Sequence, residues 1–569
     1  MVRNIPIVVG VIGDIAPSVL GDALEKIEKT CAYSSIYLLI SDADKKALAL
    51  PDQIHVASVD VLFQNQEEAI KGELISAYIL RHAHVLLTGS NPVDSEKLQN
   101  RMLNSELGHL YTGASVEDSL IPEVPVLQEK NSLILWNLEE VAEFDWAREW
   151  EAASKPDSDT GSDEDGFYKN AIRSLRAIND FNEKSQLEMT SKVWSDGRKW
   201  FLFAQNEIKE KNDDNVEVLL TSRPALESSE QEGVELLADI YASANTLANS
   251  TQEHSFRNFT ILSVIAAIAM VCFVYFDRVE DASWHWNLGF VLFAMFAWLL
   301  SWFFGRKKHH LLHLQYRSLA EGIRIQAAWF MVGLQSSVID YYPAKQKQEL
   351  GWIIEAMRGI HAILPYNRQK TPFSKSRIDF IRHGWLLDQK KYLEGKIQGS
   401  ETSYKQQFKS YKNMVFWSQF LGKWPLRVGV GLATYLGLTK MEVDHPPEFI
   451  QQLKDMLLQF MPLETWQLAC VPDWLLGLFI VIPIAVSLVV SRYASAIQIE
   501  AEADWYESSL GFYSRANMQL ENYSGDLAGD REMASAVSLR LGRAILHEQA
   551  AWVDMHKQMD LFESVESKD

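Results

Sequence analysis

The sequence predicts an α/β N-terminal domain followed by an α-helical membrane domain with two transmembrane hairpins and long cytoplasmic helices. Apolar β-branched runs alternate with helical patterns over roughly the first 150 residues, as in sheets of mainly parallel strands. Long charge-free apolar runs lie further along the chain, and such runs are typical of membrane-spanning helices. The 569 residues are enough for several domains, since a single core rarely grows beyond about 250 to 300 residues.

Composition excludes several classes of protein. The net charge of −21 argues against a nucleic-acid partner, because such a protein needs a basic surface for phosphates. Three scattered cysteines are too few for a disulfide framework or a Cys-based zinc site. The N-terminal histidines lack metal-ligand spacing and are more often structural; they are His55, His82, His84 and His109. We therefore predict no metal, no cofactor and no catalytic residue, and an enzyme is the less favoured class.

The α/β domain is predicted over residues 1–144. Period-two and short buried patterns predict five strands, at Pro6–Val11, Ser35–Ile40, Ile54–Val61, His84–Thr88 and Ser132–Leu135. Helical patterns between them predict helices at Val19–Lys29, Gln66–Arg81 and Ser95–Leu107.

Small and polar residues follow three of these strands. In parallel sheets ligands bind beyond the carboxyl ends of the strands, and glycine lets a phosphate approach the backbone. The candidate ligand-binding residues are Gly10, Gly13, Asp14, Ser41, Thr88, Gly89 and Ser90. The third glycine of a dinucleotide fingerprint and a Walker lysine are both missing. An equally weighted alternative is that the glycines only form tight turns.

An acidic stretch at 145–166, rich in Ser, Asp and Gly, predicts a flexible linker. Helical patterns continue through 167–258 as cytoplasmic helices and lead directly into the first hairpin, 259–304. Its spans are Thr260–Phe276 and Asn287–Phe304, which are free of charge and flanked by tryptophans.

A second hairpin is predicted at 414–490. Trp474–Val490 is a clear apolar span, whereas Met414–Leu438 carries Lys423 and Arg427. Charge at the bilayer centre is costly, so we expect these two bases at the cytoplasmic mouth or lining water in a pore. The alternative is that this segment is an interfacial helix.

Flanking charges predict the topology. The segments Asp277–Trp286 and Met441–Asp473 are mostly acidic, whereas Arg257, Arg306 and Arg492 lie on the other side. By the positive-inside rule both termini are cytoplasmic. The N-terminus shows no signal peptide, because its apolar run ends early at Asp14. We expect a multi-pass protein whose partner is the lipid bilayer.

Further cytoplasmic helices are predicted at 305–413 and 491–569. In the first, an apolar face accompanies Arg317, Glu321 and Arg324, whose helical spacing lets them pair along the surface. Together with Tyr316 they are candidates for coupling cytosolic movement to the membrane. Oligomerisation stalks and simple bundle packing are the alternatives.

Five runs resemble a bacterial family in which a SLOG-like Rossmannoid domain is joined to a SLATT membrane module, a SMODS- and SLOG-associating two-transmembrane effector. They are IVVGVIGD at Ile7–Asp14, ELLADIYASAN at Glu235–Asn245, YRSLAEGIRIQAAWFMVGL at Tyr316–Leu334, KQKQELGWIIEAMR at Lys345–Arg358 and HGWLLDQKKYL at His383–Leu393. The resemblance covers roughly residues 1 to 400. Asp14 stands where that family usually has a His-Arg pair.

The resemblance implies a pore-forming effector of the bacterial inner membrane, gated by a nucleotide-derived ligand and active in antiphage defence. It further implies a homo-oligomer and leaves room for an operon-encoded protein partner. Two alternatives stay open. A membrane-tethered nucleotide-processing enzyme requires an acid or base such as Asp14 in the ligand crevice, and a scaffolding membrane protein fits a degenerate ligand site.

Overall fold

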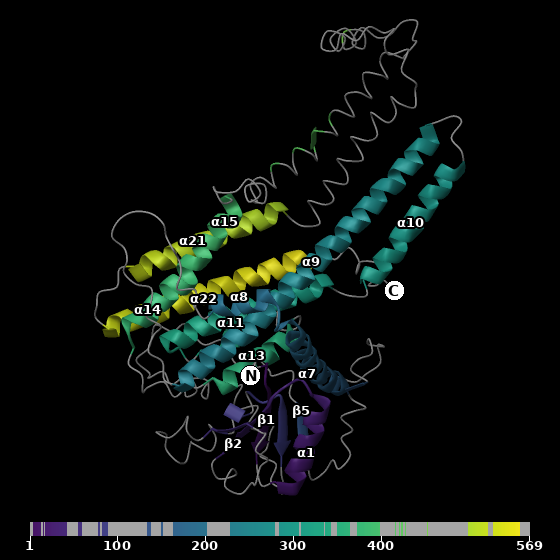
Figure 1. Ribbon diagram of the computed structural model, residues 1–569. Helices are drawn as coiled ribbons and strands as arrows, with labels where there is room; N and C mark the ends of the chain where they lie inside the picture. The colour runs from purple at the N-terminus through teal and green to yellow at the C-terminus, as the bar shows by residue number, and fades with distance from the viewer. Residues whose placement is uncertain are drawn as a thin grey trace. The chain divides into compact units, whose positions relative to one another are not determined.

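The structure is a computed structural model of the whole chain (Figure 1). It describes residues 4–12, 15, 17–41, 55–59, 75, 78–79, 82–88, 134–137, 150–151, 163–201, 228–278, 284–305, 309–334, 336–342, 350–364, 373–398, 416, 420, 423–424, 427, 452, 499–521 and 527–557.

The chain divides into two compact units. The sheet unit comprises Met1–Ser250, His313–Gln389 and Phe512–Val553, and the hairpin unit comprises Thr251–Leu312, Lys390–Gly511 and Asp554–Asp569. The α/β domain and most of the helices that are predicted to be cytoplasmic therefore belong to one body.

The sheet is parallel throughout and has the strand order β3-β2-β1-β4-β5. Its strands are β1 (Ile7–Ile12), β2 (Ile36–Ile40), β3 (His55–Ser58), β4 (Val85–Thr88) and β5 (Ile134–Asn137). This is the order of doubly wound α/β folds. All five predicted strands are confirmed, and so is the first helix, which is α1 (Pro17–Thr30). Most of Gln66–Arg81 and all of Ser95–Leu107 lie outside the described residues.

Helices make up most of the remaining described chain. They are α7 (Asp163–Glu188), α8 (Lys192–Phe201), α9 (Ser228–Arg278), α10 (Trp284–Gly305), α11 (His309–Val332), the short η2 (Val338–Tyr341), α13 (Gly351–Ile363), α14 (Lys375–Ile381), the π-helical turn η4 (Arg382–Leu387), α15 (Asp388–Gln398), α21 (Ile499–Glu521) and α22 (Leu527–Lys557). Where the structure describes residues of 167–258, 305–413 and 491–569, they are mostly helical, as predicted. Helix α7 begins at Asp163, inside the predicted linker 145–166.

The amino ends of the strands are fixed to α7 and α13. The Asn182 side chain of α7 accepts a hydrogen bond from the Ile5 N–H at 3.0 Å and donates one to the Ile5 carbonyl at 2.9 Å. His84 Nδ1 accepts from the Val8 N–H, so His84 Nε2 carries the proton and donates to the Glu355 carbonyl of α13 at 2.7 Å. Because these groups are buried, their hydrogen bonds hold the sheet in one register on the helices.

Gly359 allows α13 to approach the sheet. A Cβ atom at this position would lie 2.8 Å from the Pro6 carbonyl oxygen and 2.8 Å from the His84 ring. Both neighbours belong to the buried edge just described, so neither can move without disturbing its hydrogen bonds.

Helix α11 is the centre of the helical layer. Nearly every residue from His313 to Val332 is buried, which is typical of a helix surrounded by others. Its Trp329 Nε1 donates to the Ser538 carbonyl of α22 at 2.9 Å. Gly542 of α22 permits this contact, because a Cβ there would lie 2.7 Å from Trp329.

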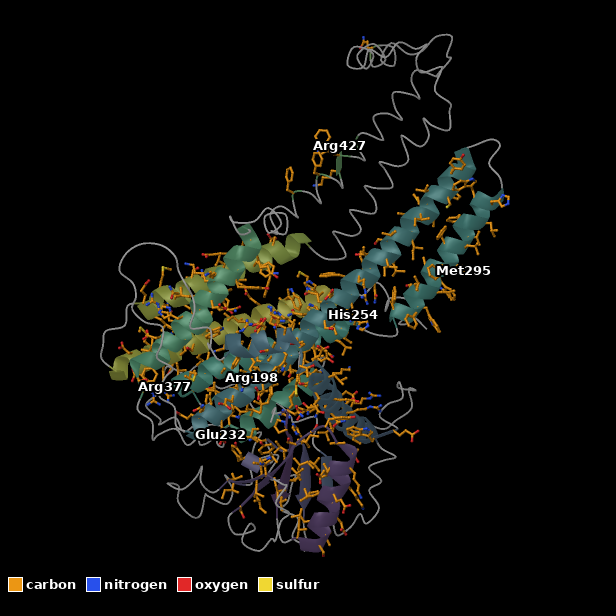
Figure 2. The ribbon with its side chains drawn as sticks, in the orientation of Figure 1. Arg198, Glu232, His254, Met295, Arg377 and Arg427 are labelled. Carbon is orange, nitrogen blue, oxygen red and sulfur yellow. The ribbon has the colours of Figure 1, made fainter. Side chains whose placement is uncertain are left out.

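Within the described residues, two helices are long and apolar enough to cross a membrane. They fall in Glu230–Phe273 and His285–Val332, and their apolar parts coincide with the predicted spans Thr260–Phe276 and Asn287–Phe304. The helices α9 and α10 contact each other through Phe273 and Phe290, 5.2 Å apart between ring centroids. Most of the large side chains here are exposed, such as Met295 at 51% (Figure 2).

The second predicted hairpin lies largely outside the described residues. Trp474–Val490 is not described, and only Phe416, Phe420, Lys423, Trp424 and Arg427 represent Met414–Leu438.

We predict that Gly359→Ala loosens the sheet from α13. The added methyl group has no room beside Pro6 and His84, so we expect a loss of about 1 to 3 kcal/mol, as for overpacking elsewhere. Hydrogen exchange should rise at the amides of Ile5 and Val8. Gly21→Ala in α1 is the matched control, since nothing lies within 4 Å of a Cβ there. Equal exchange in both variants would contradict the proposed tight contact.

Candidate functional site

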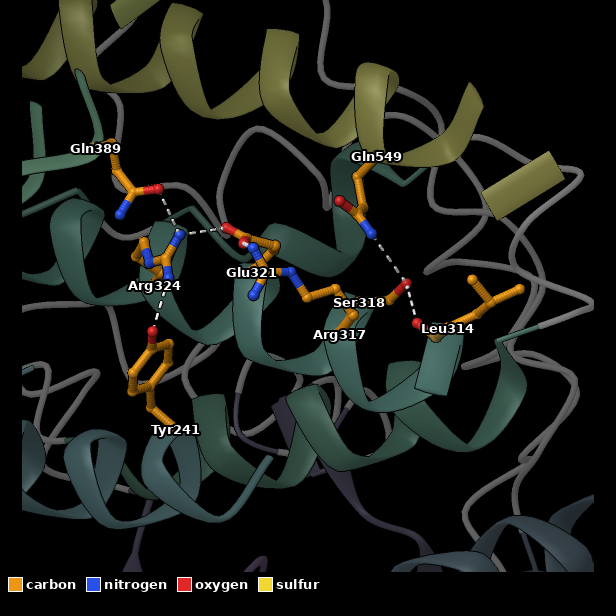
Figure 3. Close-up of polar contacts among 8 residues, drawn as sticks. All are labelled: Tyr241, Leu314, Arg317, Ser318, Glu321, Arg324, Gln389 and Gln549. Carbon is orange, nitrogen blue, oxygen red and sulfur yellow. Dashed lines mark hydrogen bonds and ion pairs between the residues drawn. The ribbon is translucent and has the colours of Figure 1, made fainter. Parts of the chain in front are cut away.

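A buried polar cluster lies where α9, α11 and α15 meet (Figure 3). Glu321 of α11 has one carboxylate oxygen 2.7 Å from Arg324 and the other 3.1 Å from Arg317. Arg324 also donates to the Gln389 amide oxygen of α15 at 2.9 Å and to the Tyr241 hydroxyl of α9 at 2.7 Å. One guanidinium therefore joins three helices.

The electrostatics of the cluster favour a charged Arg324. Burial alone would lower the pKa of this guanidinium. The charge of Glu321 and the contact with Tyr241 outweigh this effect, so the pKa of Arg324 lies above its ordinary value. Burial raises the pKa of Tyr241, so its hydroxyl stays protonated. Tyr513 of α21 is also buried near this cluster, and burial raises its pKa too. These pKa shifts therefore keep Arg324 charged and the hydroxyls of Tyr241 and Tyr513 protonated.

The predicted pairing of Arg317, Glu321 and Arg324 is confirmed, but its predicted surface location is wrong. The side chains of Glu321 and Arg324 are 7% and 8% exposed, and that of Arg317 is 21% exposed. The spacing of charges along one helix reveals partners on that helix, but it carries no information about the helices that cover it. Tyr316 is buried too, and burial raises its pKa to about 12.

A second buried ion pair fixes the beginning of α9. Arg377 of α14 donates from one nitrogen to both carboxylate oxygens of Glu230, at 3.0 and 2.9 Å. Its other terminal nitrogen donates to the Met331 carbonyl near the end of α11, at 3.2 Å. Both side chains are almost fully buried. This pair and the cluster around Arg324 therefore hold α9 at two places.

The turn η4 and the start of α15 connect these contacts to α21. Arg382 donates to the Asn517 side chain at 3.2 Å and to Glu521 at 2.5 Å, while Gln389 reaches Arg324. A π-helical turn shifts the register of the side chains that follow it, and such turns are frequent at functional sites.

The candidate ligand residues lie in different parts of β1, β2 and β4. Gly10 is inside β1, which extends to Ile12, and Ser41 follows the last residue of β2. Thr88 ends β4 and is paired with Ile12 in the register of β1. Gly13, Asp14, Gly89 and Ser90 lie outside the described residues.

Gly10 has a packing role. A Cβ atom there would lie 2.4 Å from Ile79 and 3.0 Å from Ala83. The missing side chain therefore lets the segment before β4 pack on the sheet. Ser41 and Thr88 remain at the carboxyl edge, where a doubly wound sheet binds its ligand.

Lys423 and Arg427 are both exposed. The Arg427 guanidinium lies over the Trp424 ring, 5.9 Å from its centroid (Figure 2). No group of three or more His, Cys, Asp or Glu side chains that could hold a metal ion occurs among the described residues.

Sequence reasoning missed Tyr241, Gln389 and the Glu230–Arg377 pair. The first two lie inside the runs Glu235–Asn245 and His383–Leu393, so the motifs contained them without indicating their partners. Comparison of the chain with protein-family models, curated proteins and solved structures finds no match.

We predict that Glu321→Gln is strongly destabilising. It leaves two guanidiniums in the cluster without their shared carboxylate, and breaking a buried pair costs about 3 to 5 kcal/mol. The midpoint of denaturant unfolding measures the loss. Glu394→Gln is the control, because Glu394 forms an exposed pair with Lys390 at 3.8 Å and such pairs contribute about 0 to 1 kcal/mol. Similar midpoints for both variants would rule out the proposed role of Glu321.

We predict that His383 makes the protein less stable in acid. Burial, followed by the charge of Arg382, lowers the pKa of this half-buried imidazole. The unfolded chain therefore binds more protons as the pH falls through about 6.5. The stability contribution is present above that pH and is lost below it.

The melting temperature at pH 7.5 and pH 5.5 tests this prediction. In His383→Gln the decrease on acidification should be smaller than in the wild type. His547→Gln, at an exposed position of α22, should retain the full decrease. A wild-type decrease in His383→Gln would show that other groups cause it.

Proposed function

We propose that the chain is an oligomeric inner-membrane effector that forms a pore and is gated at its N-terminal domain by a nucleotide-like ligand or a protein partner. Antiphage defence is the setting that the family resemblance favours. The observation that carries the proposal is the continuity of α9, Ser228–Arg278. Its first half belongs to the buried polar network, and its second half is an exposed apolar helix.

The attachment of the sheet supports ligand sensing at the opposite edge. The hydrogen bonds from Asn182 and His84 lie at the amino ends of the strands, so they leave the carboxyl-end position of Ser41 and Thr88 for a ligand. A ligand that changed the helices around the carboxyl ends of the strands would act on a sheet whose amino ends are fixed to α13. Movement of the sheet would then be passed to the helical layer.

The two ion-pair systems support a switch between discrete arrangements. Arg324 and Arg377 are buried with specific partners, and a partial displacement of α9 would leave these charges without their partners. Intermediate positions of α9 are therefore unfavourable, so the helices would move between complete alternative packings. A ligand needs about 5.5 kcal/mol of preference for one arrangement to switch it almost completely.

The hairpin supports both insertion and oligomerisation. The 22 residues of α10 span about 33 Å, and a bilayer core is about 30 Å thick. Gly289 of α10 lies close to α9, since a Cβ there would be in ordinary van der Waals contact with the Cys272 sulfur, 3.6 Å away. Two such helices are too few to enclose water, and a second hairpin would add at most two more. A pore therefore requires several copies of the chain.

We predict that liposomes carrying the purified chain release ions only with the trigger. The assay compares ion flux with and without an extract of phage-infected cells. Thr88→Phe should reduce the triggered flux at least tenfold by obstructing the carboxyl edge of the sheet. Thr190→Phe, at an exposed position between α7 and α8, is the matched control and should respond as the wild type does. If a folded, inserted wild-type chain shows no ion flux either with or without the extract, the result would contradict a pore.

A further inference from the structure

Five described residues of the Met414–Leu438 segment form one helical face, here called the aromatic–cation face. They are Phe416, Phe420, Lys423, Trp424 and Arg427, all helical and all exposed. Their spacings of 4, 7, 8 and 11 residues from Phe416 place them within about a third of the helix circumference. The two charges and the three aromatic rings therefore share one side of the helix.

The rings form a continuous row that ends at the arginine. Phe416 and Phe420 are stacked, with centroids 6.1 Å apart, and Phe420 and Trp424 follow at 6.0 Å. The Arg427 guanidinium lies 5.9 Å from the centroid of Trp424, in the range of a cation–π contact. Phe416 is 59% exposed and Trp424 is 51% exposed. Such large exposed rings indicate a partner that accepts both aromatic and charged groups.

Charge indicates the nature of that partner. Lys423 and Arg427 are one helical turn apart, and like charges at this spacing repel each other. Among the residues that the structure describes, no carboxylate forms an ion pair with either of them. An anion on the exposed side would relieve the repulsion.

A position across the bilayer does not suit this face. Met414–Leu438 has its midpoint at Leu426, so a span over that window would place both cations near the bilayer centre, where charge is most costly. The headgroup layer suits it better, because tryptophan is enriched there and long basic side chains reach phosphates while their stems contact apolar groups.

We propose that the aromatic–cation face is a membrane-interface anchor in which Lys423 and Arg427 bind phosphate groups of anionic lipids while Phe416, Phe420 and Trp424 lie at the boundary of the acyl chains. The aromatic–cation face then lies along the membrane surface. The inference rests on the membrane insertion proposed above.

Two other occupants fit less well. A second copy of the same face would bring four cations together without an anion. A water-filled pore would solvate the cations but would also expose three aromatic rings to water. The lipid interface is the occupant that satisfies the charges and the rings together.

Lipid-dependent stability of the full-length chain tests the anchor. The melting temperature is measured in nanodiscs of phosphatidylcholine alone and with increasing phosphatidylglycerol. We expect phosphatidylglycerol to stabilise the wild type, and its apparent affinity to fall about fivefold for each cation removed in Lys423→Gln and Arg427→Gln. Arg427→Lys should keep most of the effect, because the phosphate contact survives.

A double variant carries both Lys423→Gln and Arg427→Gln. The control has the same net charge as this double variant. It carries Lys192→Gln and Lys391→Gln, two exposed lysines of α8 and α15, and should respond to phosphatidylglycerol as the wild type does. Equal loss in the control would show a net-charge effect and would overturn the anchor. Inorganic phosphate should not replace the lipid, and full replacement would also overturn it.

Depth measurement provides an independent test. Phe420→Cys is labelled with a fluorophore in a Cys470→Ser background, since Cys31 and Cys272 are buried. Lipids with a quencher in the headgroup should quench more strongly than lipids with a quencher at the end of the acyl chain. Stronger quenching by the deep probe would indicate a span, and quenching by aqueous iodide alone would indicate a pore lining; either result overturns the proposal.

These results separate the anchor from the proposed function. A wild-type chain that washes out of vesicles at alkaline pH would refute membrane insertion and the anchor with it. An inserted chain whose stability ignores phosphatidylglycerol would refute the anchor alone.

Discussion

The Glu321 carboxylate is the group on which the helical layer depends. It lies between the guanidiniums of Arg317 and Arg324, inside a helix that is buried on nearly all sides. The Arg324 guanidinium cannot be buried there without it, since burial of an uncompensated charge costs more than most single packing contacts contribute. The positions of α9 and α15 follow from this requirement, because Tyr241 and Gln389 accept further hydrogen bonds from the terminal nitrogens of Arg324.

Buried neutral polar groups also need hydrogen-bond partners, and this need determines the contact between the sheet and α13. The His84 imidazole connects the Val8 amide to the Glu355 carbonyl, and Gly359 leaves the space for it. A neighbouring pair of imidazoles, His82 and His361, lies 3.1 Å apart between nitrogens. The sheet and α13 therefore form one body, which explains how an α/β domain preceding an acidic stretch belongs to the same unit as the later helices.

The sequence predicted local structure well and partners poorly. The five strands follow from runs such as Ile36–Ile40, because strand periodicity and turn residues are local signals. Arg324 and Glu321 are three residues apart, so their pairing is predictable from the spacing along the helix. Tyr241 and Gln389 are 83 and 65 residues from Arg324, and no local period encodes such distances. The sequence makes Gly10 a candidate ligand residue, because its close contact with Ile79 depends on tertiary packing that no local pattern reveals.

Helix α9 combines two kinds of constraint that rarely occur in one element. Its first half has Glu230, Asp239 and Tyr241 in specific polar contacts, which fix its rotation and its position along the axis. Its second half exposes apolar side chains, and apolar contacts are non-directional. Because a helix is stiff along its axis, rotation or translation allowed by the polar half must reappear in the apolar half. The buried polar contacts therefore fix the rotation and axial position of the first half of α9, and the apolar half imposes little register of its own.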